Sequence, residues 1–364
     1  LRKAGQMTAN YQKRLSNLRH ILEQQQLEAL LVSRPENVFY ISGFSGGEGQ
    51  LLVTQQESYL FADGRYKEQA LQEASHCEFI LYKRYFTKAL AEVTESQGIG
   101  EIGFEKDFIT YRQWEMLQDA VAGELLPVQD LVEKLRLVKD ESEIDLIREA
   151  GVITASAFRY LLGEIHPGQS EQQVAGILEY YMRSHGSGPL AFETIAASGE
   201  RGALPHGSAT EKKIRRGELI TLDLGATYQG YAADLTRTIC IGTVSARQQE
   251  IYELVQEAQE RGLRAVRAGV RAAEVDEAAR EFLIDAGYGD YFVHSLGHGV
   301  GLAVHEAPRI AQEVDIVLEP GMVITIEPGI YIPQWGGVRI EDTVLVKENG
   351  CEILTPVTKD LVVV

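Results

Sequence analysis

The chain has 364 residues, 45% of them hydrophobic, which suits one large or two medium domains with a true core. Its formal net charge of −18 argues against sequence-independent nucleic-acid binding and against an anionic membrane surface. Three scattered cysteines form neither a disulfide framework nor a zinc-binding spacing, and no apolar run approaches the ~18 residues of a membrane-spanning helix. We therefore expect a cytoplasmic protein with no membrane or nucleic-acid partner. Met7 is a plausible native start, so residues 1–6 are expected to be an extension.

Helix and strand patterns alternate through the first part of the chain. Residues 8–26 predict an amphipathic helix with Tyr11, Leu15, Leu18 and Leu22 on one stripe. Strands are predicted at residues 27–32, 37–41, 50–53 and 58–62, the last two as a hairpin. Asp63 is expected to cap the helix that follows. These elements predict an α/β domain over residues 1–132.

The rest of the chain, residues 133–364, combines long helices with hairpins. Helices are predicted at residues 141–162, 171–183, 246–268 and 272–286. Strands are predicted at residues 191–197, in the segment after residue 218, and from residue 291 onward between Gly-rich turns. Helices outside and a hairpin-built sheet inside predict an α+β catalytic domain.

Two pairs of acidic residues are the most informative feature of this second domain. Asp223 and Asp234 flank a turn centred between Tyr228 and Gln229, and Glu327 and Glu341 flank a turn centred on Gln334. Facing residues of an antiparallel hairpin lie symmetrically about its turn, so each hairpin can place two carboxylates on one face. Like charges in such positions need neutralisation, and four carboxylates from two hairpins suit two cations.

The two acidic segments also resemble each other. Ile-Thr-Leu-Asp-Leu-Gly-Ala from residue 220 aligns with Ile-Thr-Ile-Glu-Pro-Gly-Ile from residue 324. This offset is far longer than a solenoid period, and it predicts two similar halves that meet at a shared metal site.

Four histidines lie close to these segments in the sequence. His298 stands between two glycines, which let its imidazole approach a buried ion, so we expect it to be the nitrogen ligand. An imidazole with four carboxylates forms an oxygen-rich site that suits Mn, Co, Fe or Zn. His206 lies in a stiff Pro-His-Gly turn, while His294 and His305 lie on either side of His298.

With these motifs in order, the chain resembles the pita-bread metallopeptidases, the superfamily of methionine aminopeptidase, aminopeptidase P and prolidase. The resemblance rests on the series Pro-His-Gly, Asp…Asp, Gly-His-Gly, His-Glu, Glu-Pro-Gly and Arg-Ile-Glu-Asp. It covers essentially the whole chain, because the first domain resembles the creatinase-type domain of proline-specific members.

The resemblance implies a ligand set for two metal ions, Mn or Co before Zn or Fe. By this comparison Asp234 and Glu341 bridge both ions, Asp223 binds one of them, and His298 and Glu327 bind the other. It also implies that a water between the ions is activated to attack a peptide carbonyl.

The resemblance assigns roles to the remaining polar residues. It implies that Glu327 is the general base, that His305 stabilises the tetrahedral intermediate and that His206 bonds near the scissile amide. His294 is expected in the substrate pocket, and Arg339 is expected to orient the carboxylates and is counted with the substrate-binding residues.

The creatinase-type domain favours cleavage of an Xaa-Pro bond. Arg309 is expected to grip the terminal carboxylate of a dipeptide, which favours prolidase, an Xaa-Pro dipeptidase, over aminopeptidase P on longer peptides. A metal-free creatinase and a non-catalytic pita-bread binding protein are the rival interpretations, and the complete ligand set argues against both. The resemblance further implies a homodimer, with the loop of residues 43–49 as a candidate contact near the partner's active site.

Overall fold

The computed structural model describes residues 2–364, with side chains from residue 10 onward. The expected extension before Met7 includes residue 1, which lies outside the described residues. The chain divides into two compact units, one ending at Arg136 and the other beginning at Leu137. Of the helices described, none combines the length and the apolar character needed to cross a membrane.

The first unit is built on a six-stranded sheet in the order β4-β3-β2-β1-β5-β6. Its strands are β1 (Ala29–Val32), β2 (Gln50–Thr54), β3 (Ser58–Ala62), β4 (Glu78–Leu81), β5 (Glu101–Glu105) and β6 (Glu124–Val128). The predicted hairpin is confirmed, because β2 and β3 pair antiparallel with Val53 opposite Ser58. The remaining neighbours are parallel except for β1 and β2.

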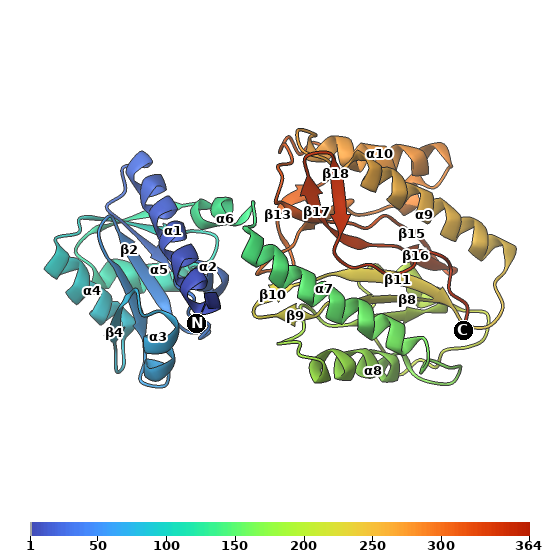
Figure 1. Ribbon diagram of the computed structural model, residues 1–364, viewed down its shortest axis with the longest axis horizontal. Coiled ribbons are helices and arrows are strands. Elements are labelled where there is room, and N and C mark those ends of the chain that lie inside the picture. Colours follow the sequence, from blue (N-terminus) through green and yellow to red (C-terminus); the bar gives the residue numbers. More distant parts are fainter. Residues whose placement is uncertain (1) are drawn as a thin grey trace. The chain divides into compact units, whose positions relative to one another are not determined.

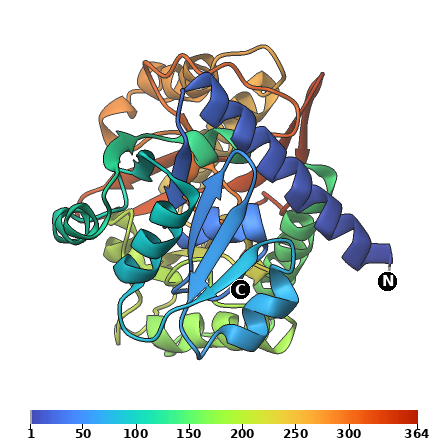
Figure 2. The same ribbon diagram turned by 90° about the vertical axis from the view of Figure 1, so that its left-hand side faces the viewer.

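Helices flank this sheet (Figure 2). They are α1 (Arg2–Gln24), α2 (Pro35–Ser42), α3 (Lys67–Glu73), α4 (Phe86–Gln97), α5 (Tyr111–Ala120) and α6 (Leu131–Arg136). The predicted stripe of Tyr11, Leu15, Leu18 and Leu22 on α1 is buried, as expected for the apolar side of an amphipathic helix.

Two predictions in this unit are wrong. Residues 37–41 are not a strand but lie within α2, which has Pro35 in its first turn and ends at Gly43 with φ of 75°. Proline at the start and a left-handed glycine after the end are helix boundary signals, and they outweigh a short apolar run. Asp63 does not cap a helix, because α3 begins at Lys67 and the Asp63 carboxylate instead accepts hydrogen bonds from Arg65.

The second unit places two pairs of helices on opposite sides of its sheets (Figure 1). These helices are α7 (Glu141–Leu161), α8 (Glu171–Ser184), α9 (Ala246–Ala265) and α10 (Ala272–Asp285). All four were predicted to within a few residues at their ends. Capping boxes that begin at Asp140, Ser170 and Ser245 fix the starts of α7, α8 and α9.

Short antiparallel strands fill the space between the helix pairs. A three-stranded sheet, β11-β8-β7, consists of β7 (Ile195–Ser198), β8 (Leu219–Leu224) and β11 (Leu235–Cys240). A five-stranded sheet, β13-β12-β14-β17-β18, consists of β12 (Gly297–Gly299), β13 (Glu306–Ile310), β14 (Val323–Ile326), β17 (Asp342–Lys347) and β18 (Gly350–Ile353). Two ribbons extend these sheets, β9 (Thr227–Tyr228) with β10 (Tyr231–Ala232), and β15 (Gly329–Ile332) with β16 (Gly336–Arg339).

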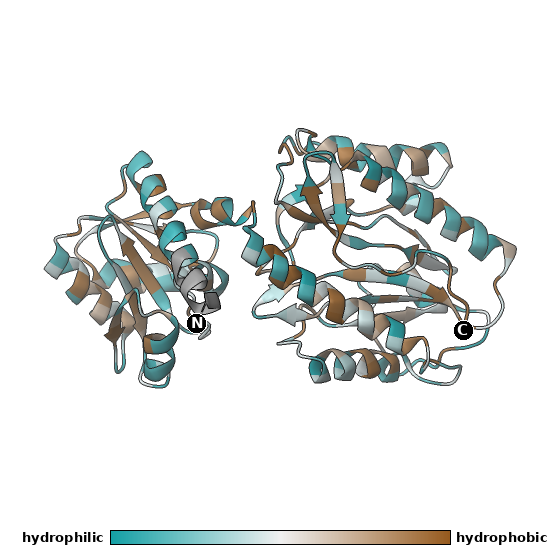
Figure 3. Cartoon of the chain, viewed as in Figure 1, coloured by the Kyte–Doolittle hydropathy of each residue, from teal (hydrophilic) through white to brown (hydrophobic). Residues whose placement is uncertain are grey.

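Two buried clusters hold the layers together. The first joins α7 and α8 to β8 and β11, and the second joins α9 and α10 to β14, β16 and β17. Apolar residues (brown) accordingly follow the strands and the sheet-facing sides of the helices in Figure 3. Each half of the unit is thus two helices on an antiparallel sheet, which confirms the predicted pita-bread fold with its internal repeat.

Candidate metal centre

The first acidic hairpin has a different register from the predicted one. Tyr228 pairs with Tyr231, and Asp223 pairs with Thr236 rather than with Asp234. Gln229 and Gly230 both have positive φ, as a tight two-residue hairpin turn requires, and this turn shifts the centre by one residue. Asp234 lies two positions from Thr236, so the two aspartates are diagonal neighbours on one face instead of directly opposed.

The second acidic hairpin has the predicted register. Ile326 pairs with Asp342 and Gly329 pairs with Arg339, which places Glu327 and Glu341 at facing positions about Gln334. Both glutamates lie where one strand pair gives way to the next, between β14 and β15 and between β16 and β17.

The two hairpins and the Gly-rich strand β12 bring their functional side chains together. Ligand atoms of Asp234, His298 and Glu341 all lie within 4.8 Å of one another. Nε2 of His298 is 3.7 Å from Asp234 Oδ2 and 3.2 Å from Glu327 Oε1. Asp223 is close enough for its charge to raise the pKa of Asp234. Side chains separated by more than 100 residues therefore form one compact group.

The donor set of this group fits bound cations. Among the described residues, Asp223 Oδ1, Asp234 Oδ1 and Glu341 Oε1 are buried oxygens that accept no hydrogen bond. Burial of unpaired carboxylate oxygens is costly, and a divalent cation is the simplest partner for several of them at once. One imidazole beside these oxygens is a combination that Mn, Co, Fe and Zn accept.

Perturbed pKa values report the same crowding. Burial raises the pKa of Asp234, and the neighbouring charge of Asp223 raises it further. Burial likewise raises the pKa of Glu341, and Asp234 adds to this effect. Burial alone would lower the pKa of His298, but its hydrogen bond with Glu327 raises that pKa to about 9. Negative charge in this group thus exceeds what the protein itself neutralises.

Polar residues that the sequence reasoning missed hold the carboxylates in place. Thr325 Oγ1 donates to Glu327 Oε1 at 3.0 Å, and Thr236 Oγ1 donates to Glu341 Oε2 at 2.7 Å. Thr343 Oγ1 accepts the Asp234 N–H at 3.1 Å. Thr325 and Thr236 each stand two residues from an acidic ligand in their own chain segment. The two-residue period of strands was therefore the signal that would have found them.

Arg339, which the resemblance implies is an orienting residue, connects the two hairpins. Its Nη2 donates to Asp223 Oδ2 at 2.6 Å, its Nε donates to Thr236 Oγ1 at 3.0 Å, and its Nη1 donates to the hydroxyl of Tyr331 at 2.8 Å. Arg339 is buried, and its bonds to Thr236 and Tyr331 are shielded from water.

The histidines of the predicted site surround the carboxylates. The His305 ring lies 4.1 Å from that of His298, and burial lowers the pKa of His305, which the charges of His298 and His206 lower further. His206 is exposed in the loop after Pro205. Both ring nitrogens of His294 form hydrogen bonds within the protein. Nδ1 lies 2.8 Å from Ser295 O, and Nε2 lies 2.9 Å from the Tyr331 hydroxyl.

Arg309 lies apart from this network. It is exposed on β13 and, within the described part of the chain, forms no ion pair.

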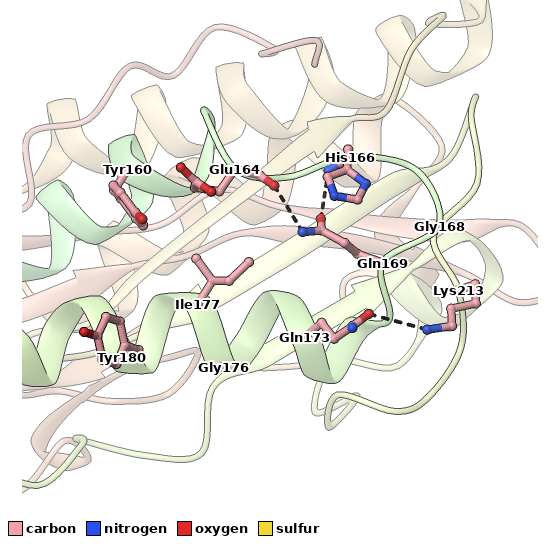
Figure 4. Close-up of a pocket in the computed structure, with 10 residues that line it drawn as sticks. All are labelled: Tyr160, Glu164, His166, Gly168, Gln169, Gln173, Gly176, Ile177, Tyr180 and Lys213. Carbon is pink, nitrogen blue, oxygen red and sulfur yellow. Dashed lines mark hydrogen bonds between the residues drawn. The ribbon is translucent and has the colours of Figure 1, made fainter.

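A separate cavity of about 610 Å³ opens between α7 and α8 (Figure 4). Of the described residues lining it, none belongs to the predicted site. Its polar groups bond with one another, as in the pairs of Gln169 with the His166 backbone and of Gln173 with Lys213. Among the described residues, the side chains grouped closely enough to hold a metal ion are those of Asp234, His298 and Glu341, which do not line this cavity.

Comparison with known proteins agrees with this geometry. Residues 145–348 match metallopeptidase family M24, and residues 14–138 match the creatinase/prolidase N-terminal domain. The chain is 42% identical to the Xaa-Pro dipeptidase of Pyrococcus furiosus over 96% of its own length and 99% of that protein.

Two solved structures are similar over nearly the whole chain. An Xaa-Pro dipeptidase from Bacillus anthracis has a TM-score of 0.95 and 41% identity, covering 98% of this chain and all of that one. An X-Pro aminopeptidase from Thermotoga maritima has a TM-score of 0.87 and 40% identity, covering 93% of this chain and 98% of that one.

Proposed function

We propose that this chain, which belongs to metallopeptidase family M24, hydrolyses the peptide bond between an N-terminal residue and proline as an Xaa-Pro dipeptidase. The observation that carries the proposal is the group of four carboxylates and one imidazole, buried or half-buried, three of whose carboxylate oxygens have no partner among the described residues. The similarity to dipeptidases over essentially the full length supports the substrate class.

Five residues would hold the cofactor, two divalent ions. They are Asp223, Asp234, His298, Glu327 and Glu341. Manganese or cobalt is proposed first and zinc or iron second, because the oxygen-rich set with one nitrogen suits these ions. When bound, such ions polarise a substrate carbonyl and lower the pKa of water.

The chain's own residues would handle the protons of the reaction. In the metal-free protein, burial alone would raise the pKa of Glu327, but the hydrogen bond from His298 lowers that pKa to about 2, so Glu327 is ionised at neutral pH. Metal binding at His298 would remove this hydrogen bond, and Glu327, as an ion ligand, would remain a carboxylate that can accept a proton from the attacking water. His305, with its lowered pKa, is neutral at pH 7 and can donate one hydrogen bond to the developing oxyanion. His206, exposed on the loop after Pro205, is proposed to bond near the scissile amide.

Substrate binding is proposed for residues at the edge of this group. Arg309 is exposed and unpaired within the described chain, and its planar guanidinium suits the terminal carboxylate of a dipeptide. His294 can contact the substrate only if it releases the Tyr331 hydroxyl, while Arg339 acts through the residues it holds.

Aminopeptidase P activity on longer peptides is the second candidate. It is favoured by the similarity to the Thermotoga maritima aminopeptidase, whose identity to this chain nearly equals that of the dipeptidases. The test is cleavage of Met-Pro and of Met-Pro-Ala by chelator-stripped protein with and without added Mn²⁺ or Co²⁺. Metal-dependent cleavage of the dipeptide alone supports the first candidate, and preference for the tripeptide supports the second.

We also propose that the protein works as a homodimer in the cytoplasm. The candidate contact, residues 43–49, is a loop folded around the buried Phe44, with Ser45, Gly47 and Glu48 exposed for a partner. Light scattering should give twice the chain mass of 40.4 kDa, and a mass equal to that of one chain would contradict the dimer.

A further inference from the structure

A buried carboxylate outside the metal centre organises the segment that carries His206. Glu171 is fully buried in the first turn of α8. Its Oε1 accepts hydrogen bonds from the Ser198 N–H and hydroxyl, both at 2.8 Å. Its Oε2 accepts from Arg201 Nε at 2.9 Å, from the Thr210 hydroxyl at 2.7 Å and from the Thr210 N–H at 3.1 Å. One side chain thus fastens both ends of residues 198–210.

This arrangement keeps the Glu171 carboxylate charged. Burial alone would raise the pKa of Glu171, but the hydrogen bonds from Thr210 and Ser198 outweigh burial and lower that pKa. The first turn of a helix also favours a negative charge. A charged acceptor that receives several bonds holds its donors more firmly than a neutral one would.

The segment is held a second time next to His206. Arg201, which Glu171 orients, donates through Nη2 to Ser208 O at 2.6 Å. On the other side of His206, Arg339 Nη1 donates to Pro205 O at 3.1 Å. The exposed histidine therefore stands on a short loop that is anchored at one end to the metal centre and at the other end to Glu171 through Arg201.

We propose that Glu171 is a positioning residue, which sets the place of the His206 imidazole through the Arg201–Ser208 and Thr210 contacts. The proposal rests on the proposed function, in which His206 bonds near the scissile amide. It goes beyond that function because Glu171 is neither a metal ligand nor in contact with one among its described partners. A displacement of about 1 Å can cost on the order of 100-fold in rate, so the loss of this clamp should be visible in turnover.

The variant Glu171→Gln keeps the shape of the side chain but leaves only one oxygen to accept five donors. We expect kcat for Met-Pro to fall by about 10–100-fold, with metal content unchanged. The matched control is Ser170→Ala, which removes the N-cap of the same helix without removing any bond to Glu171 and should retain wild-type kcat. Thr210→Val, which deletes a single donor, gives a milder second variant in case Glu171→Gln does not fold.

Two readouts separate positioning from general damage. In a double-mutant cycle with His206→Ala, the Glu171→Gln change should cost little once His206 is absent. In hydrogen exchange, amides of residues 198–210 should lose protection in Glu171→Gln and keep it in Ser170→Ala. The proposal would be overturned if the losses in kcat of Glu171→Gln and His206→Ala multiply in the double variant. It would also be overturned if residues 198–210 of Glu171→Gln exchange at the wild-type rate. If no form of the protein cleaves Xaa-Pro peptides, the proposed function fails, and the exchange result still decides whether Glu171 fixes the loop.

Discussion

Arg339 Nη2 lies 2.6 Å from Asp223 Oδ2, so that a buried guanidinium joins the second acidic hairpin to the first. The same guanidinium bonds to Thr236, which in turn bonds to Glu341. A single arginine thereby fixes two acidic residues that stand 118 positions apart in the sequence.

Replacing Arg339 by lysine should weaken metal binding and catalysis. A lysine cannot reproduce the fork that reaches Asp223, Thr236 and Tyr331 together. Loss of a partner that orients metal ligands costs about 10–100-fold in affinity or activity, and titration calorimetry with Mn²⁺ measures the affinity. Arg261→Lys, in an exposed ion pair with Glu257, is the control and should behave as the wild type. Unchanged Mn²⁺ affinity in Arg339→Lys would contradict the orienting role.

Replacing Glu341 by glutamine should stabilise the metal-free protein at neutral pH. Burial, followed by the charge of Asp234, raises the pKa of Glu341, so the folded state holds this proton more tightly than the unfolded state does. The protonated Glu341 carboxyl contributes fully to stability below a pH of about 4.5, which is the ordinary pKa of the group. This contribution is lost as the pH rises through the pKa of Glu341 in the folded state. The melting temperature of chelator-treated wild type should therefore fall as the pH rises above about 4.5, and that of Glu341→Gln should fall less.

Saturating Mn²⁺ should make the wild type more stable than Glu341→Gln, which is the reverse of the order expected for the metal-free proteins. A ligand at one hundred times its Kd stabilises the folded state by about 2.7 kcal/mol, which we expect for the wild type and not for Glu341→Gln. Equal shifts in melting temperature on adding Mn²⁺ would show that Glu341 does not hold the ion.

Replacing Lys139 by methionine should destabilise the fold. Its Nζ lies 2.9 Å from Glu306 Oε1, and the two side chains are 1% and 9% exposed. Removing one partner of a buried pair costs about 3–5 kcal/mol. Lys347, which pairs with Glu352 at 2.7 Å but is half exposed, provides the control, and Lys347→Met should cost less than about 1 kcal/mol. Equal urea midpoints for the two variants would refute this difference.

Replacing Arg309 by alanine should raise KM for Met-Pro by about tenfold or more, because one bidentate pair with the terminal carboxylate is lost. KM for Met-Pro-Ala, whose carboxylate lies farther from the scissile bond, should change little. Steady-state kinetics on both peptides measures the difference. Equal effects on the two peptides would remove Arg309 as the group that selects dipeptides.

Much of the fold could be predicted because the long helices carry both an apolar stripe and end signals. The helix from Glu141 to Leu161 combines a buried stripe with a capping box at Asp140. By contrast, α2 is only 8 residues long, and so short an apolar run fits a strand as well as a helix. Its proline and glycine boundaries were the better guide.

The candidate site was predictable where pairing is regular and less so where a turn sets the register. The facing positions of Glu327 and Glu341 followed from symmetry about Gln334. Symmetry about the expected turn did not predict the register of Asp223 and Asp234. The hairpin turn requires left-handed residues, and these are Gln229 and Gly230, which lie at its centre. Contacts between distant segments, such as that of Arg339 with Asp223, leave no local pattern in a single sequence.

The number of Mn²⁺ ions bound per chain tests the central claim most directly. Chelator-stripped wild type and Asp234→Asn would be dialysed against Mn²⁺, and bound metal would be counted by mass spectrometry of the digested protein. We expect two ions per chain in the wild type and fewer than one in Asp234→Asn, because the ions share one group of carboxylates. No bound metal in the wild type, or two ions retained in the variant, would contradict a dinuclear centre built on Asp234.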